Sequence, residues 1–456
     1  MANIKKRGNT YNISVSCGYT PQGKQIRKYM TWKPAPNMTE KQIKKELERQ
    51  KVLFEEKVLS GQCVSGDLRF SEFAERWFLD YAEKQLKPRT IQRYREHLER
   101  INPMIGHIRM DKLQPAHIMS LYDKIAAERQ DNKYRAKINL KEQMNRKNVT
   151  RAKLHELSGV SKGTITNAWN GKNITENTAD KIAKALQTKR NAIFEPVVID
   201  TALAPMTVRH YHQFLSSVLS TAVYWQIIPS NPCQRVKPPK AENKEAKYLD
   251  EKDFSRLLVA LEGEPIQYKT LIYLLLYTGM RRGEAMGLEW KDIDFEKGVI
   301  HIQRTSAYLP GRGVFEDTAK NKTSVRSIHI DAGAGKMLKE YRAYQNAERL
   351  KIGSLWKDTD RLFTQWDGSP MNPDTPSGWF HNFVKRHELP NICLHSLRHT
   401  HASLLIANHA DIRTVSGRLG HARTSTTMDI YSHLIRSADK EAACTIEKVI
   451  NATERH

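Results

Sequence analysis

The segment from Val236 to Glu245, VKPPKAENKE, constrains the fold of this 456-residue chain more than any other. Its two adjacent prolines, three lysines and lack of apolar periodicity mean that it can neither continue a helix nor enter a core. We expect it to link regions that fold around separate cores. A chain of this length should hold two to four such domains.

Before this linker, apolar residues recur at helical spacing. Phe70, Phe73 and Trp77 share one face of a first helix, and Pro88 suits the first turn of a second. The remaining helices are expected over residues 115–129 and 207–226. Together the four predict a helical bundle that occupies residues 66–240.

Residues 130–204 interrupt this bundle and are too many for a structureless loop in a compact domain. Leu154, Leu157 and Val160 follow helical spacing. The stretch from Arg151 to Ile165 closely resembles the helix-turn-helix of phage-repressor-type regulators. We therefore expect residues 130–204 to fold as an inserted module.

In that resemblance Gly159 takes the turn and Ser161 caps the recognition helix. Lys162, Thr164 and Asn167 would then reach base edges or phosphates. The alternative is a helix-turn-helix that serves only for packing or protein contacts.

Residues 1–62 predict a small α+β domain. Apolar and polar residues alternate from Tyr11 to Cys17, and a second strand over residues 25–32 carries Arg27 and Lys28. A charged helix follows, opened by the capping box of Thr39 and Gln42. Such a basic sheet could bind a DNA groove, or it could be an ordinary solvated face.

The net charge indicates the class of partner. Lysine and arginine number 74 against 50 aspartates and glutamates, a formal charge of +24, which favours nucleic acid. A membrane is disfavoured because no apolar run approaches the roughly 20 residues of a spanning helix, and no apolar segment follows the basic N-terminus. Five scattered cysteines favour a reducing cytoplasm over structural zinc.

Residues 245–456 predict a mostly helical domain with some strands, of which residues 299–304 and 324–330 alternate like a hairpin pair. This region carries Arg281 after Thr278-Gly279, His395 and Arg398 in one helical turn, His421 after Leu419-Gly420, and Tyr431. Guanidinium groups hold phosphate bidentately, and a phenol can attack phosphorus once fixed donors stabilise the developing charge. The set therefore indicates DNA strand exchange through a phosphotyrosine.

The order and spacing of these motifs resemble the tyrosine recombinase family, also called phage-type integrases. The resemblance covers nearly the whole chain except the insert. It implies a multidomain, mainly α protein with small β-sheets. Residues 1–62 would be an α+β arm-binding domain, residues 66–240 a helical core-binding bundle, and residues 245–456 a mixed α/β catalytic domain.

The resemblance also implies the role of each matching residue. Arg281 and Arg398 would clamp the scissile phosphate, while His395 and His421 would hydrogen-bond it and manage protons. Tyr431 would be the nucleophile that forms a 3′-phosphotyrosyl intermediate and frees a 5′ hydroxyl.

Further residues would assist. Lys322 fits the hairpin lysine that serves the family as general acid, with Lys320 as its rival. Glu284 and His399 would orient the arginines. The spacing of His395 and His399 also fits a zinc pair, but the HExxH glutamate is absent and Arg398 would repel the metal. The family needs no metal and no cofactor.

The implied function is a site-specific recombinase that integrates or excises a mobile element in a bacterium. Its partners would be double-stranded DNA at core and arm-type sites, three further copies in a tetrameric synapse, and an excisionase or host DNA-bending protein. It would work in the cytoplasm, at the nucleoid. An apolar helix over residues 438–450 could pack on its own domain or on a neighbouring copy.

Two alternatives belong to other classes. The insert would also suit a transcriptional regulator that kept recombinase architecture but exchanges no strands. A relaxing topoisomerase of the same chemistry would act as a monomer and without sequence preference.

Overall fold

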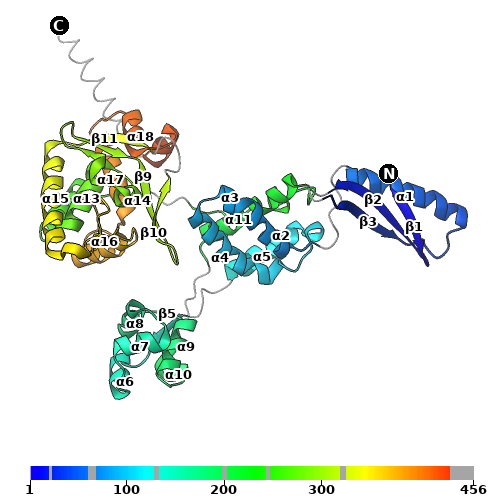
Figure 1. Cartoon of the computed structure of the whole chain (residues 1–456), viewed down its shortest axis with the longest axis horizontal. Helices are drawn as coiled ribbons and strands as arrows, with labels where there is room; N and C mark the ends of the chain where they lie inside the picture. Colours follow the sequence, from blue (N-terminus) through cyan, green and yellow to red (C-terminus); the bar gives the residue numbers. More distant parts are fainter. Residues whose placement is uncertain are drawn as a thin grey trace, which may run out of the picture. The chain divides into compact units, whose positions relative to one another are not determined.

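The computed structural model describes residues 2–19, 23–59, 68–127, 133–197, 203–242, 247–318 and 325–431. The chain divides into two units, Met1–Glu242 and Asn243–His456 (Figure 1). The boundary falls within the Lys- and Pro-rich segment that the sequence predicts to be a linker. Within the described residues, no helix combines the length and apolar character needed to cross a membrane.

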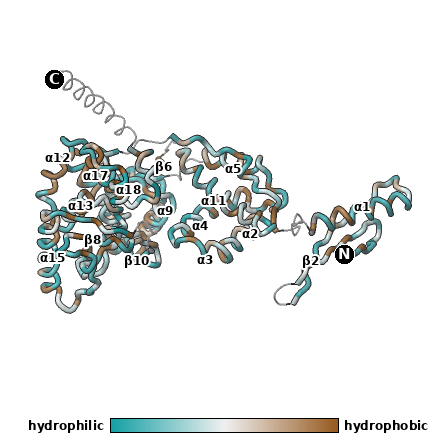
Figure 2. Tube along the Cα trace, turned by 90° about the horizontal axis from the view of Figure 1, so that it is seen from above, coloured by the Kyte–Doolittle hydropathy of each residue, from teal (hydrophilic) through white to brown (hydrophobic). Residues whose placement is uncertain are grey.

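The N-terminal part of the first unit is a three-stranded antiparallel sheet with one helix. Strands β1 (Asn3–Arg7), β2 (Thr10–Tyr19) and β3 (Gln25–Trp32) pair in that order. Helix α1 (Glu40–Leu59) has apolar residues interspersed among polar ones (Figure 2). It contributes Leu47 and Phe54 to a core with Ile13 and Val15 of β2. The predicted alternation and the capping box are confirmed, whereas β1 is a strand that the sequence did not indicate.

The next part is a helical bundle built around aromatic residues. Trp77 is fully buried, and its Nε1 donates to Thr221 Oγ1 at 2.9 Å. The predicted face of Phe70, Phe73 and Trp77 is buried, and Pro88 occupies the first turn of its helix. The longer helices are α2 (Phe70–Trp77), α4 (Pro88–Ile105), α5 (Pro115–Ala127) and α11 (Pro205–Tyr224); one turn, η1 (Phe78–Ala82), and the short α3 (Glu83–Gln85) follow α2.

The insert has a core of its own. Gly159 adopts φ +66° at the turn, and Ser161 Oγ accepts a hydrogen bond from Thr164 N, so the predicted helix-turn-helix is confirmed. Lys133 pairs with Val197, which brings the two ends of the insert together. Its elements are β4 (Lys133–Ala136), α6 (Leu140–Arg146), α7 (Arg151–Ser158), α8 (Lys162–Trp169), β5 (Ile174–Thr175), α9 (Glu176–Ala185), α10 (Arg190–Ile193) and β6 (Phe194–Val197).

The second unit packs its helices around α13 (Ile266–Thr278), which contacts both α15 (Ala332–Ile352) and α17 (Leu394–Ala407). The other helices are α12 (Glu251–Leu261), α14 (Arg282–Gly287), α16 (Thr375–Arg386) and α18 (Ile412–Leu419). A sheet of β7 (Ile293–Asp294), β8 (Val299–Ile302) and β11 (Arg326–His329) has the order β11-β8-β7.

The strands of this unit differ from the expected hairpin pair. β8 and β11 do pair antiparallel, with Val299 opposite His329. They are not joined by a turn, because a separate hairpin of β9 (Arg304–Leu309) and β10 (Gly313–Thr318) lies between them in sequence. Lys320, Lys322 and the expected helix over 438–450 lie outside the described residues.

Candidate active site

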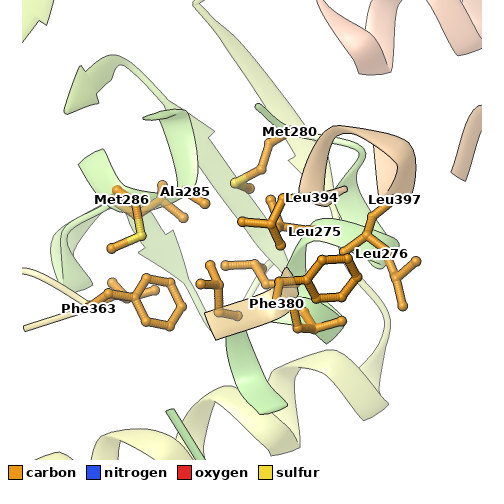
Figure 3. Packing of buried hydrophobic residues seen from close by; sticks show 14 of the residues in the cluster. Leu275, Leu276, Met280, Ala285, Met286, Phe363, Phe380, Leu394 and Leu397 are labelled. Carbon is orange, nitrogen blue, oxygen red and sulfur yellow. The ribbon is translucent and has the colours of Figure 1, made fainter. Parts of the chain in front are cut away.

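A turn between two helices positions Arg281. Helix α13 ends at Thr278 and is capped by Gly279, whose φ of +62° suits glycine. A Cβ on Gly279 would lie 2.5 Å from the His401 ring, so the turn packs too closely against α17 for any larger residue. Met280 is buried in the same core as Leu394 and Leu397 of α17 (Figure 3). Arg281, which follows, is therefore held beside the helix that carries the second arginine.

Glu284 fixes the orientation of Arg281. The Arg281 Nη1 donates to Glu284 Oε1 at 2.8 Å, and its backbone N donates to Oε2 at 2.9 Å. Arg326 of β11 donates to the same carboxylate at 2.9 Å. Burial raises the pKa of Glu284, but the hydrogen bonds and charges of Arg326 and Arg281 outweigh it and leave the pKa below its usual value.

Arg398 is buried, with 3% of its surface exposed. Its Nη1 donates to Gly279 O at 2.8 Å. Its Nη2 has no hydrogen-bond partner among the residues that the structure describes. Burial and then the charge of Arg281 lower its pKa to about 9, so an anion placed here would relieve an electrostatic cost.

His395 and His421 flank the arginines. His395 lines the cleft, and partial burial with the charges of Arg398 and Arg281 lowers its pKa. His421 Nδ1 hydrogen-bonds the Oγ1 of buried Thr427 at 2.8 Å. Burial and the same two arginines lower its pKa to about 4. Both rings are therefore neutral at pH 7 and can donate or accept one hydrogen bond on each side.

The turn before His421 is tied to β11. Gly420 adopts φ +67°, and a Cβ there would lie 2.9 Å from Arg326 Nη1. Arg326 Nε also donates to Arg418 O at 2.6 Å, and Gly420 O lies 3.4 Å from Arg281 Nη2. Arg326 thus connects the Glu284–Arg281 pair to the turn that carries His421.

Tyr431 is 1% exposed and packs with Ala402, Val415 and Leu419. Its hydroxyl hydrogen-bonds His399 Nδ1 at 2.8 Å. Burial raises its pKa to about 12, although Arg398 acts in the opposite direction.

This contact changes the expectation for His399. The hydrogen bond that the structure gives its ring goes to the phenol and not to an arginine. Glu284, by contrast, does contact Arg281 as expected.

A cleft of about 750 Å³ opens beside these groups. Arg282, next to Arg281, also borders it but donates to Asp374 and Ser377 on the side of α16. The lining residues are Lys247, Arg281, Arg282, Gly283, Ser377, Phe380, His381, Asn391, Ile392, Cys393, Leu394, His395, Ser396 and His399.

Sequence reasoning missed Arg326, Thr427 and the contact between His399 and Tyr431. An arginine in a strand and a threonine in a helix carry no signal of their own in so basic a chain. The contact joins residues 32 positions apart, which no helical period relates.

The expected DNA-contact residues lie on two surfaces of the first unit. On β3, Arg27 is exposed and Lys28 half-exposed. On α8, Lys162 and Asn167 are exposed, whereas the half-exposed Thr164 hydroxyl lies 2.8 Å from Ser161 Oγ.

Comparison with known proteins agrees with this geometry. The phage integrase family matches residues 247–437, the N-terminal SAM-like domain of phage integrases residues 69–126, and the Cro/C1-type HTH DNA-binding domain residues 139–197.

The ICEBs1 integrase of Bacillus subtilis is 30% identical over 257 residues, covering 56% of this chain and 69% of that protein. A XerC-like tyrosine recombinase of Caldanaerobacter subterraneus is 31% identical over 257 residues, 53% of this chain and 65% of that protein.

The solved structure of the Tn1549 transposon integrase with transposon right end DNA has a similar fold. Its TM-score is 0.55 at 17% identity, over 82% of this chain and 100% of that one. The sequence matches establish that the chain belongs to the phage integrase family and is a site-specific tyrosine recombinase, an enzyme that breaks and rejoins DNA.

Proposed function

We propose that this recombinase integrates or excises a mobile element by cleaving double-stranded DNA at a core site. The ICEBs1 relative is named an integrase and the Tn1549 relative a transposon integrase, which favours this use over others. The net charge of +24 suits a polyanionic substrate.

The Nη2 of buried Arg398, which has no hydrogen-bond partner within the described part of the chain, is the observation that carries the proposal. A buried guanidinium with a vacant donor is costly unless an anion completes it. Arg281 lies near enough for its charge to lower the pKa of Arg398, and its side chain is oriented by Glu284. We assign the two arginines to the scissile phosphate, which supplies the missing acceptor oxygens.

The remaining groups suit in-line displacement at phosphorus. Tyr431 attacks and forms the 3′-phosphotyrosyl bond, while His395 and His421 donate hydrogen bonds to the non-bridging oxygens. Lys322 protonates the leaving 5′ oxygen, with Lys320 the alternative acid. No free nucleotide is needed, because the covalent intermediate keeps the bond energy for rejoining.

Assembly follows from the number of nucleophiles. Exchange between two duplexes cuts four strands, and each chain offers one Tyr431, so we propose a homotetramer around two core sites. The helix expected over residues 438–450 would join neighbouring copies. An excisionase or a host DNA-bending protein would set the direction of the reaction, and the bacterial nucleoid would be its place of action.

We assign further DNA contacts to the first unit. We propose that residues 1–62, through Arg27 and Lys28, bind arm-type sites, that residues 66–240 hold the core site, and that residues 245–456 do the chemistry.

The insert over residues 130–204 would bind another duplex segment through Lys162, Thr164 and Asn167. Between residues 133 and 197 it has 14 lysines and arginines against five acidic residues, and it matches a DNA-binding domain.

A nicked duplex that carries the core site tests the catalytic assignment. Loss of the short fragment beyond the nick traps the intermediate, so the protein should become covalently joined to a 3′ end through Tyr431. Binding without any adduct would favour the second candidate, a transcriptional regulator with recombinase architecture, which the DNA-binding insert supports.

The insert is tested by footprinting. Lys162→Ala combined with Asn167→Ala should remove one protected segment and leave core cleavage intact. Lys181→Ala, an exposed lysine on α9, is the matched control and should change the footprint little. Unchanged protection in the double variant would make the insert a protein-contact module.

A further inference from the structure

The hydrogen bond of Tyr431 goes to a histidine that carries no catalytic role in the assignments above. The phenolic oxygen lies 2.8 Å from His399 Nδ1, within the range for proton transfer. The ring of His399 also borders the cleft, so it reaches from the buried phenol to solvent.

The other titratable groups near the phenol are less suited to take its proton. His421 uses Nδ1 for Thr427, and the structure gives it no hydrogen bond to Tyr431 among the described residues. The ring of His395 packs perpendicular to the ring of His399, with centroids 4.9 Å apart. The structure gives it no hydrogen bond to the phenol among the described residues. Arg398 is a cation and has no lone pair to offer.

We propose that His399 is the general base that deprotonates Tyr431 during strand cleavage. The phenolic proton moves to Nδ1, and the phenolic oxygen forms a bond to phosphorus. The bond from phosphorus to the 5′ oxygen breaks, and that oxygen takes a proton from the general acid. His399 then returns a proton to the cleft through Nε2. This inference rests on the proposed function.

The resting protonation states leave His399 free to accept the proton. Burial, His395 and Arg398 lower the pKa of His399 to about 4, so its ring is a free base at pH 7. The pKa of Tyr431 is raised to about 12, which leaves about one phenolate in 10⁵ at that pH. Attack by the phenol therefore needs an acceptor for its proton, and His399 is the neutral ring to which the structure gives the phenol's hydrogen bond.

Two substitutions separate the base from the hydrogen bond. His399→Asn keeps an acceptor oxygen near the position of Nδ1 but has almost no basicity, whereas His399→Leu removes both. If His399 is the base, both variants should form the adduct on the nicked duplex about 100-fold more slowly or worse at pH 7. If His399 only positions the phenol, His399→Asn should cleave at close to the wild-type rate, and the proposal fails.

The pH profile gives a readout that misfolding would not produce. Wild-type cleavage should change little between about pH 6 and pH 8, since the base is already free. His399→Asn should gain about tenfold per pH unit, because the phenolate fraction grows at that rate. The variant keeps all the titratable and charged groups that face the His399 ring, which are His395, Arg398, His421 and Tyr431. Parallel profiles would overturn the proposal.

A fluorinated tyrosine at position 431 completes the test. Ring fluorines lower the phenol's pKa, so this residue should restore much of the rate to His399→Asn and little to Lys322→Ala. Absence of rescue in His399→Asn would refute the base. A wild-type protein that forms no adduct would instead refute the proposed function, so the two failures are distinguishable.

Discussion

Arg398→Met should stabilise the DNA-free protein while abolishing strand cleavage. Burial and Arg281 lower the pKa of Arg398 from the ordinary arginine value to about 9, which corresponds to a penalty of about 5 kcal/mol on the charged group. Methionine removes that penalty and fills similar space. It also leaves Gly279 O without its donor, at a cost of about 1–3 kcal/mol. We expect a net gain of about 2–4 kcal/mol.

The gain should depend on pH in a defined direction. Because the folded-state pKa of Arg398 lies below its unfolded value, the folded protein releases this proton first as pH rises. The penalty is therefore complete at pH 7 and is relieved above about pH 9. The stability difference between Arg398→Met and wild type should shrink over that range.

Hydrogen exchange of α13 and α17 in the intact chain, in buffer without sulfate or phosphate, measures the effect locally. Arg361→Met is the control, since Arg361 is also buried but pairs with Glu289 and Glu316. Its loss leaves Gly287 O without its donor and Glu316 without this ion pair, although Glu289 keeps Arg304 and Lys291, and should destabilise by about 1–3 kcal/mol. If Arg398→Met is less stable than wild type at pH 7, the charge of Arg398 is not destabilising in the absence of phosphate, and the reasoning is refuted.

Three further predictions concern the reaction. Tyr431→Phe should bind the core site in a gel-shift assay but form no covalent adduct, and an adduct at the wild-type level would move the nucleophile elsewhere. Lys322→Ala should slow cleavage of the nicked duplex more than Lys320→Ala, and the reverse ranking would transfer the acid to Lys320. EDTA should leave cleavage intact, since arginines stabilise the phosphate; a strong loss would reopen a metal role.

Local sequence patterns predict much of this fold. The apolar face from Phe70 to Trp77, the capping box at Thr39 and the turn at Gly159 are confirmed because each depends on residues a few positions apart. The hairpin of β9 and β10 was missed. Its first strand buries Ser306 and Ala307 in succession, so the burial does not alternate as a half-exposed strand would require.

The candidate site can likewise be predicted only in part from the sequence, because the motifs identify its residues but not their contacts. Sequence motifs place Arg281, Arg398 and Tyr431 in order, and the structure brings them to one region of the second unit. The partner of each side chain depends on packing between distant segments. His399 is the clearest example, since its ring nitrogen meets Tyr431 only because α17 and the segment after α18 pack together around Ala402 and Leu419.

The site carries more positive than negative charge, and this surplus explains why Arg398 has no carboxylate partner of its own in the structure as described. Arg326 neutralises Glu284, which leaves Arg281 and Arg398 as two positive charges while the low pKa values of His399 and His421 keep those rings neutral. A phosphodiester carries one negative charge in the ground state and close to two in the five-coordinate transition state. The surplus therefore matches the transition state better than the substrate, as catalysis requires. An enzyme with Arg398 paired in the resting state would be more stable and would lose this difference.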